Sequence, residues 1–253
     1  MLIVTADDYG KERTATDCIL LCGSRSRITS ASAMVFMQDS ERAAALARDS
    51  PIEFGLHLNF TEPLNGASAP GPLRLHHDRV RRFLTLHKLA PVFYNLQLQQ
   101  SFRILFKAQC AEYERLYHVP PLFYNGHHHM HLCANVLLGG LMPRSSRIRN
   151  SFTFEAGEKG VFNRAYREIL RRWIRARYTS TDSFHSIEPA HDLGRLRRLI
   201  ERSHAEVVEI ETHPESPAEA SLLLGDRYGE LLADAQLGRF RDVVKRGPGI
   251  PRL

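Results

Sequence analysis

The chain has 253 residues, 43% of them hydrophobic, with a formal net charge of +6 and four cysteines. It is long and apolar enough to bury a full core, and we expect one domain over residues 1–253. The absence of a signal-peptide pattern and of any run of 18 apolar residues predicts a cytoplasmic protein with reduced thiols. The basic charge suits anionic partners, but no aromatic platform or recognition helix accompanies it, so we expect no nucleic-acid partner.

Apolar runs and helical patterns alternate through the first sixty residues. A strand is predicted over 2–6 and ends at Asp7 and Asp8. A helical pattern around residues 18–22, a strand over 28–37 and an Ala-rich helix over 39–50 follow. A strand over 52–60 places His57 and Asn59 on its polar face. Residues 61–78, rich in Pro, Gly and Asn, are predicted to form a loop.

The same rhythm continues to the end of the chain. Helices are predicted over 78–88 and 91–117, a strand over 120–132, a helix over 134–142 and a strand over 147–154. Helices over 160–178 and 192–204, a strand over 205–214 and a helix over 226–245 complete the pattern. This alternation predicts an irregular (β/α) barrel with mainly parallel strands, although the pattern alone does not exclude an open sheet.

Polar residues that bind metals or move protons stand where several predicted strands end. In α/β folds these ends meet at one edge of the sheet, where ligands bind. A mixed set of histidines and a carboxylate suits zinc and other first-row metals. Because adjacent residues of an extended strand alternate, one carboxylate of the Asp7–Asp8 pair is free to bind metal and the other to act as general base. The residues concerned are Asp7, Asp8, His57, His127, His129, His131 and His213.

Each of these residues also has a plainer interpretation. Either aspartate is a reasonable cap for the next helix, and His57 is compatible with a hydrogen-bonded interior histidine. The sequence HHHMH is compatible with a compositional tract, although its neighbours are aromatic and apolar. If it continues a strand, alternation puts His127, His129 and His131 on one face and His128 on the other.

Four motifs together resemble one protein family. The segments TADDYG, FGLHLNFTEPL, FYNGHHHMH and VEIETHP, in this order, resemble the YdjC-like carbohydrate deacetylases, also called the ChbG/HpnK family. The resemblance covers residues 5–214, and RYGEL over 227–231 extends it. It implies an irregular (β/α) barrel, one divalent metal ion (Zn, Mg or Mn), and removal of an N-acetyl group from an amino sugar or glycoconjugate.

The resemblance also implies roles for individual residues. Asp8, His57 and His127 would hold the metal, Asp7 would be the general base and His213 the general acid. We expect four further residues to line the substrate pocket: His129, His131, Asn59 and Glu211.

The chain departs from the family pattern at three places. Asn125 stands where the family has Asp, which replaces a supporting carboxylate with an amide. Glu215 stands where Gly is usual. The sequence GKER after the aspartate pair replaces a Gly-Leu-Ser-like segment, so Lys11 and Arg13 either favour an anionic substrate group or lie in solvent.

Arginines concentrate in the predicted helix over 160–178, opposite an apolar face. Packing of that face on the barrel is one interpretation, and weak contact with an anionic membrane that carries a lipid-linked substrate is the other. A homodimer is compatible with the sequence. The alternative activities are ester or phosphoester hydrolysis at the same site, or sugar binding without turnover.

Overall fold

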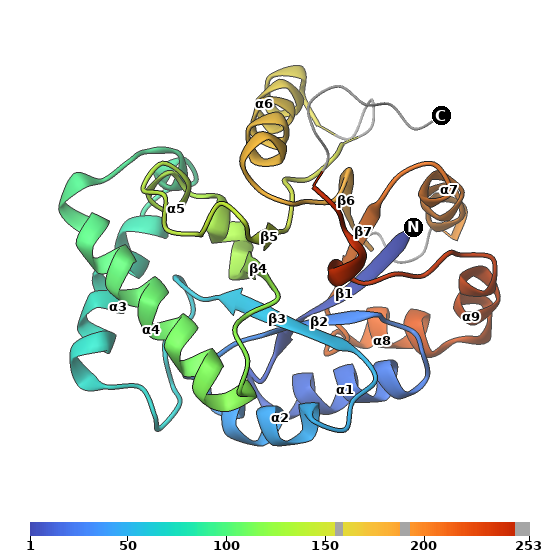
Figure 1. Cartoon of the computed structure of the whole chain (residues 1–253), viewed down its shortest axis with the longest axis horizontal. Coiled ribbons are helices and arrows are strands. Elements are labelled where there is room, and N and C mark those ends of the chain that lie inside the picture. The colour runs from blue at the N-terminus through green and yellow to red at the C-terminus, as the bar shows by residue number, and fades with distance from the viewer. Residues whose placement is uncertain (155–158, 188–192, 246–253) are drawn as a thin grey trace.

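The computed structural model describes residues 1–154, 159–187 and 193–245. Within these residues, seven parallel strands form one curled sheet in the order β5-β4-β3-β2-β1-β7-β6. Figure 1 shows the strands at the centre with helices around them. The strands are β1 (Leu2–Tyr9), β2 (Ser30–Ala33), β3 (Glu53–Leu58), β4 (Phe123–Gly126), β5 (Arg147–Ile148), β6 (Ser183–Ser186) and β7 (Val208–Thr212).

Helices connect successive strands, as parallel pairing requires. They are α1 (Arg13–Ser24), α2 (Ser40–Ala47), α3 (Gly71–Leu84), α4 (Gln99–Tyr117), α5 (Ala134–Leu137), α6 (Val161–Arg177), α7 (Leu193–Ser203), α8 (Pro217–Leu224) and α9 (Asp226–Ala233). In the described part of the chain, four short 3₁₀ helices accompany them: η1 (Ala90–Val92), η2 (Leu96–Leu98), η3 (His127–Leu132) and η4 (Phe240–Asp242). No helix among the described residues is both long and apolar enough to cross a bilayer.

The two edges of the sheet approach each other without forming a regular ladder. The Ile148 amide donates to the Thr179 carbonyl at 2.9 Å, and the Thr153 amide donates to the Phe184 carbonyl at 2.8 Å. Between these two bonds, the Asn150 side chain donates to the Thr181 carbonyl at 2.9 Å. The predicted irregular (β/α) barrel is therefore confirmed as a curled, nearly closed parallel sheet.

The inner face of the sheet is apolar at one end and polar at the other. At the apolar end the Phe240 ring of η4 stacks on Phe123, with centroids 3.9 Å apart, above Ile3. Gly55 of β3 makes room for Phe123, because a Cβ at position 55 would lie 2.6 Å from its ring. The larger core lies between the sheet and the helices. At the apolar end the buried Glu53 carboxylate is paired with Arg241 of η4, and the candidate functional residues stand at the carboxyl ends of the strands.

Several predicted elements differ from the observed ones. The predicted loop over 61–78 contains the start of α3, whose first turn carries Pro72; proline is favoured there. The helix predicted over 91–117 begins only at Gln99, after η1 and η2, and the helix predicted over 226–245 ends at Ala233. Strand β6 and helix α8 were not predicted. In the helix predicted over 192–204, residue 192 lies outside the described residues.

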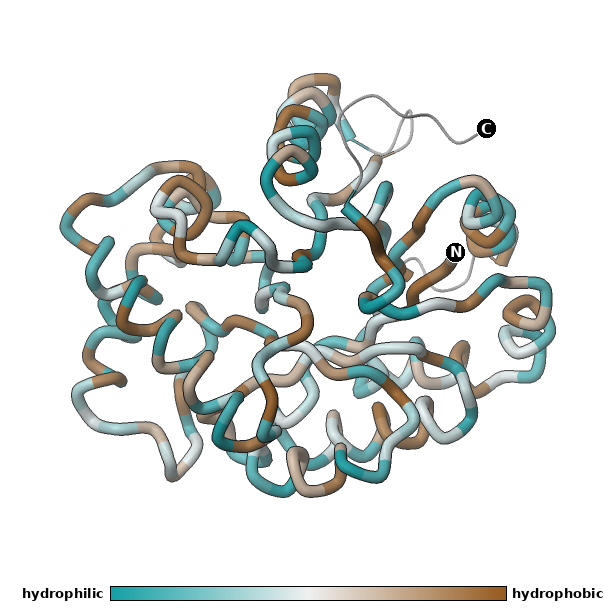
Figure 2. Tube along the Cα trace, viewed as in Figure 1, coloured by the Kyte–Doolittle hydropathy of each residue, from teal (hydrophilic) through white to brown (hydrophobic). Residues whose placement is uncertain are grey.

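Helix α6 packs less closely than its apolar pattern predicted. Ile174 is its one buried residue, while the Phe162 side chain is 94% exposed and that of Ile169 is 69% exposed. Leu170 and Trp173 pack partly against the core. Figure 2 shows hydrophobic and hydrophilic residues mixed along this helix, which lies at the top of the view. Packing on the barrel therefore accounts for only one end of the apolar face.

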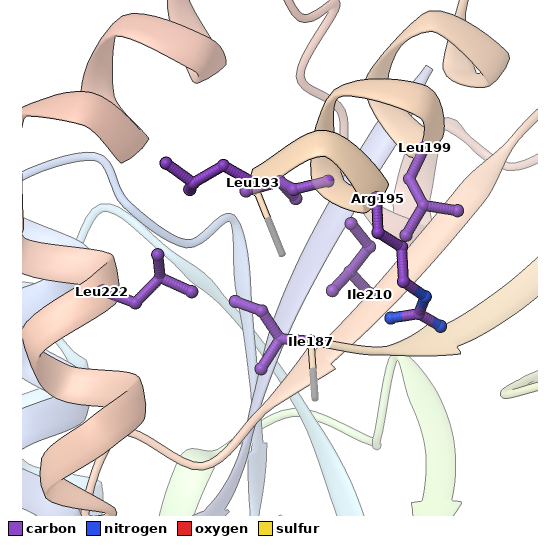
Figure 3. Close-up of a pocket in the computed structure, with 7 residues that line it drawn as sticks. Ile187, Leu193, Arg195, Leu199, Ile210 and Leu222 are labelled. Carbon is purple, nitrogen blue, oxygen red and sulfur yellow. The ribbon is translucent and has the colours of Figure 1, made fainter. Parts of the chain in front are cut away.

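A small cavity between α7, β7 and α8 is drawn in Figure 3. Its volume is about 10 Å³, and its lining is mostly aliphatic, including Leu193, Ile210 and Leu222. A cavity of this size holds at most one water molecule. We regard it as a packing gap.

Candidate metal and catalytic site

A bulge in β1 turns both aspartates toward the same region. The pairing of β1 with β2 shifts register between Ala6 and Tyr9, and Asp8 has φ = 67°. Asp tolerates this left-handed conformation better than most residues, and a bulge re-aims the side chains around it. The condition for strict alternation, an extended chain, is not met at Asp8, so alternation does not separate the two carboxylates, and their division of roles stays a prediction.

Asp8, His57 and His127 form the candidate metal group. Asp8 Oδ1 lies 2.9 Å from His127 Nδ1 and 3.2 Å from His57 Nε2. All three side chains are buried, and one potential ligand atom from each lies within 4.8 Å of the other two. His57 Nε2 has no hydrogen-bond partner although it faces the carboxylate. Two imidazoles and a carboxylate with an orphaned buried nitrogen fit a divalent cation of the zinc type.

Asn125 orients the His57 ring and contacts Asp7 through hydrogen bonds. Its Oδ1 accepts from His57 Nδ1 at 2.8 Å, which makes Nε2 the nitrogen that faces Asp8 and is available to a metal. Its Nδ2 donates to Asp7 Oδ1 at 3.2 Å and to Ser32 Oγ at 2.6 Å. An ionised aspartate at this position would have no proton for the last two bonds. The amide is thus integrated into the site, although it differs from the family pattern.

The histidine run does not continue the strand. β4 ends at Gly126, and His128 and His129 adopt left-handed conformations with φ of 51° and 58°. A Cβ at Gly126 would lie 2.8 Å from the His131 amide nitrogen, so this turn needs glycine. The prediction that His127, His129 and His131 share one face of a strand was wrong. His127 nevertheless reaches Asp8 from the first position of the turn.

Arg149 is the largest buried polar group of the site, and its side chain is fully buried. Its guanidinium donates to both oxygens of Asp7, with Nη2 2.9 Å from Asp7 Oδ1 and Nη1 bonded to Asp7 Oδ2. Nε donates to Glu209 Oε1 at 2.8 Å, and Nη1 also contacts Glu211 Oε2 at 3.2 Å. The Arg149 guanidinium therefore binds three buried carboxylates.

These contacts shift the pKa values of the carboxylates in opposite directions. Burial opposes ionisation of Asp7, but Arg149 and His57 outweigh it and hold the pKa of Asp7 well below its usual range. Burial also opposes ionisation of Asp8, but His127 and His57 outweigh it and lower the pKa of Asp8. Burial raises the pKa of Glu211 well above its usual range despite Arg149. Asp7 and Asp8 are therefore the ionised carboxylates of the site.

His213 stands at the end of β7 and is half-buried. Its backbone amide donates to Glu219 Oε2 at 2.7 Å, which fixes the chain just beyond the strand. Within the described part of the chain, the imidazole has no hydrogen-bond partner. It remains available to a ligand.

Three of the four residues expected to line the pocket are instead bonded to other parts of the protein. Asn59 is fully buried and closes a turn, because its Oδ1 accepts from the amides of Thr61 and Glu62 and its Nδ2 donates to the Glu62 carbonyl. His131 is also fully buried, with Nε2 3.2 Å from the Arg149 carbonyl, and burial lowers its pKa to about 3. Glu211 is bonded to Arg149. These contacts favour structural roles for the three residues.

His129 is the residue of that group that keeps some exposure, with 26% of its side chain accessible. Its Nε2 lies 3.6 Å from Glu211 Oε1, and its ring meets Phe152 edge-on with centroids 4.5 Å apart. Its pKa is well below the usual range because of burial, Arg149 and other cations. It is therefore a neutral imidazole at the border of the site.

Lys11 of the GKER segment contacts the site directly. Its Nζ lies 3.0 Å from Asp8 Oδ2, on the side of the carboxylate away from the two histidines. This ion pair contradicts the expectation that Lys11 merely lies in solvent, while its preference for an anionic substrate group stays a prediction. Glu215 is half-buried nearby, and burial and Asp8 raise its pKa.

Sequence patterns alone missed Arg149 and Ser32 as members of the site. Both lie within predicted strands. In the structure, Arg149 is the first residue after β5. The available signal was an arginine at a strand end, but a surrounding cluster of arginines concealed it. The Arg149 amide donates to the Tyr124 carbonyl at 2.9 Å, which keeps the residue beside β4 and directed at Asp7.

Comparisons with known sequences agree with the four motifs. The family described as YdjC-like protein matches residues 1–243. A chitooligosaccharide deacetylase of Serratia marcescens is 28% identical over 223 residues, which are 85% of this chain and 81% of that protein. A chitooligosaccharide deacetylase of Proteus mirabilis is 30% identical over 135 residues. That match spans 52% of this chain and half the length of the Proteus protein.

One solved structure is similar over nearly the whole chain. It is described as a cellobiose-phosphate cleavage protein from Enterococcus faecalis, with a TM-score of 0.66 and 18% sequence identity. The alignment covers 95% of this chain and 97% of that one. At this identity the similarity establishes the fold.

Proposed function

Because this chain belongs to the YdjC-like family, we propose that it is a metal-dependent hydrolase that removes an N-acetyl group from an amino sugar or glycoconjugate. The observation that carries the proposal is the convergence of Asp8, His57 and His127 from three strand ends, beside the paired Asp7. The relatives named chitooligosaccharide deacetylase support an N-acetylated sugar as substrate.

A divalent ion fits the donor set through His57 Nε2, one Asp8 oxygen and a nitrogen of His127. When bound, such an ion polarises the amide carbonyl and makes water more acidic. Zinc, magnesium and manganese remain the candidates. Asn125 holds the His57 ring in the required tautomer, and Lys11 occupies the second oxygen of Asp8.

Asp7 is suited to accept the proton of the attacking water. A carboxylate has about four acceptor positions, and among the described residues three are used, two by Arg149 and one by Asn125. Both Arg149 contacts hold the carboxylate ionised and fixed in place. The remaining position on Oδ2 can accept from water, which then attacks the acetamide carbonyl.

His213 completes the reaction from the end of β7, the strand that pairs with β1. Its unpartnered imidazole donates a proton to the amide nitrogen as the C–N bond breaks. Water supplies the hydroxyl that stays with the acetyl carbon. The products are acetate and the free amino sugar.

Asp7→Asn tests this division of roles. The substitution removes the charge but leaves Asp8, His57 and His127 in place. We expect metal content equal to that of the wild type and a decrease of about 10²–10⁴-fold in acetate release. The measurements are elemental analysis and an acetate assay with N-acetylated sugars.

Asp49→Asn is the matched control, because Asp49 is exposed and lies in the turn between α2 and the amino end of β3. It should change neither quantity. An Asp7→Asn enzyme with the wild-type rate would refute the assignment of the base. Hydrolysis of esters or phosphoesters without acetate release from N-acetylated sugars would favour the alternative activity, and sugar binding without hydrolysis would favour a non-catalytic protein.

A further inference from the structure

A groove lies between helix α6 and the extended segment 152–154, beside the site. It has a volume of about 340 Å³, and aromatic rings and arginines line much of it. The aromatic wall consists of Phe152 and Phe154, whose rings stack with centroids 5.7 Å apart. Arg164, Arg167 and Arg171 line it from α6. We call this region the α6 groove.

The α6 groove adjoins the candidate site through its aromatic wall. Phe152 contacts the His129 ring at 4.5 Å and stacks on Phe184 at 4.6 Å. The Arg149 guanidinium in turn lies 4.7 Å from the centre of the Phe184 ring. Ser151 Oγ donates to the Arg167 carbonyl at 2.9 Å and fixes α6 against this segment. Phe152 therefore belongs both to the wall of the groove and to the surroundings of His129 at the border of the site.

The arginines of α6 fall into two groups. Arg171 and Arg172 both bind Glu168, with nitrogen–oxygen distances of 2.7 and 2.6 Å, and Arg175 binds Asp182 at 3.0 Å. Arg164 and Arg167 have no carboxylate partner among the described residues, and the Nε atom of each is buried without a hydrogen bond.

A partly buried guanidinium without a partner is costly, because desolvation disfavours its charge. Burial accordingly lowers the pKa of Arg167. Lys159, whose Nζ lies 5.8 Å from the centre of the Phe154 ring, adds a further cation beside the groove. Glu168, the carboxylate that lines the groove, is already bound by Arg171 and Arg172, so the described part of the groove holds more cations than anions.

We propose that the α6 groove binds an anionic group, a phosphate or a carboxylate, on the part of the substrate that extends away from the N-acetyl group. Arg164 and Arg167 would bind it through guanidinium forks, which match the geometry of both anions. Phe152 and Phe154 would pack against the apolar face of an adjoining sugar ring. The proposal rests on the proposed function, since it places the N-acetylated sugar at the Asp8 site.

The test compares three substrates and three proteins. The substrates are neutral diacetylchitobiose, a phosphate ester of N-acetylglucosamine, and a disaccharide of N-acetylglucosamine with glucuronic acid. The proteins are the wild type, the double variant R164Q/R167Q, and the control R172Q, whose side chain lies 78% exposed on the same helix. Circular dichroism and the melting temperature confirm that each variant is folded.

We expect the double variant to raise KM about tenfold or more for whichever anionic substrate the groove accepts. KM for the neutral sugar should change less than about twofold, and R172Q should resemble the wild type. The substrate that loses affinity identifies the group as phosphate or carboxylate. Equal effects of the double variant on neutral and anionic sugars, or none, would overturn the proposal.

A second measurement separates failure of the groove from failure of the proposed function. Metal-free protein is titrated calorimetrically with inorganic phosphate and with glucuronate. Weaker binding of either anion by R164Q/R167Q, but not by R172Q, supports the groove even if no sugar releases acetate. Binding that the double variant leaves unchanged overturns the groove even if acetate is released from every substrate.

Discussion

Replacing Arg149 should show how far the site depends on one buried cation. Arg149→Met removes the partner of Asp7, Glu209 and Glu211 and leaves three carboxylates in a fully buried cluster. Removing one member of a buried ion pair costs about 3–5 kcal/mol. For a chain of this length each kcal/mol lowers the melting temperature by about 2–4 °C. We therefore expect a decrease of about 6–20 °C at pH 7.5.

The pH dependence of this loss follows from the carboxylates. Without Arg149, burial raises the folded pKa of Asp7 above its unfolded value and raises those of Glu209 and Glu211 further than in the wild type, so the three groups destabilise the protein more at neutral pH. This cost decreases as the pH falls toward the unfolded values, because the carboxyls are then neutral in both states. The difference in melting temperature between variant and wild type should therefore narrow between pH 7.5 and pH 5.

Arg147→Met is the matched control, with the same change of charge and size two residues away. Arg147 is half-buried, and its Nη2 makes a single long contact of 3.3 Å with the Arg241 carbonyl. We expect a loss under about 1 kcal/mol. Differential scanning calorimetry of both variants measures the melting temperatures to be compared. An Arg149→Met protein that melts within 2 °C of the wild type at both pH values would refute the role of this cation.

Two further substitutions test the buried polar network. Asn125→Asp places a second carboxylate beside Asp7 and should raise the pKa of Asp7. The acid limb of the pH–rate profile for acetate release should therefore move up by about one pH unit. An unmoved limb would contradict the contact between residue 125 and Asp7. His77 is buried, and burial lowers its pKa to about 4. Stability is therefore lost as the pH falls below about 6.5, where the unfolded chain binds a proton that the folded chain does not. Between pH 7.5 and pH 5, the free energy of unfolding of His77→Gln should fall by about 2 kcal/mol less than that of the wild type, measured by urea unfolding. Equal decreases in the two proteins would show that His77 titrates normally.

Much of the site could be predicted because parallel strands end at one edge. Asp8, His57 and His127 are distant in sequence, yet each stands at a strand end, and the structure brings them together. The barrel followed from the same alternation of strands and helices. Local patterns were sufficient wherever a strand was apolar and a helix was regular.

The rest depended on contacts between distant residues. No local pattern predicts the bulge at Asp8, which the pairing of β1 and β2 produces, or the turn after Gly126, which depends on close approach to His131. The role of Arg149 required the positions of three carboxylates on two other strands. β6 was missed because SFHS is short and polar in part, and its burial comes from its neighbours in the sheet.

The central claim is that a divalent metal held at Asp8, His57 and His127 supports removal of an N-acetyl group. The most direct measurement is acetate release from diacetylchitobiose by the protein as purified, after chelation, and after return of zinc, magnesium or manganese. We predict that release stops on chelation, returns with at least one of these ions, and does not return in a His57→Gln variant. Undiminished release by the chelated protein, or full recovery by His57→Gln, would contradict it.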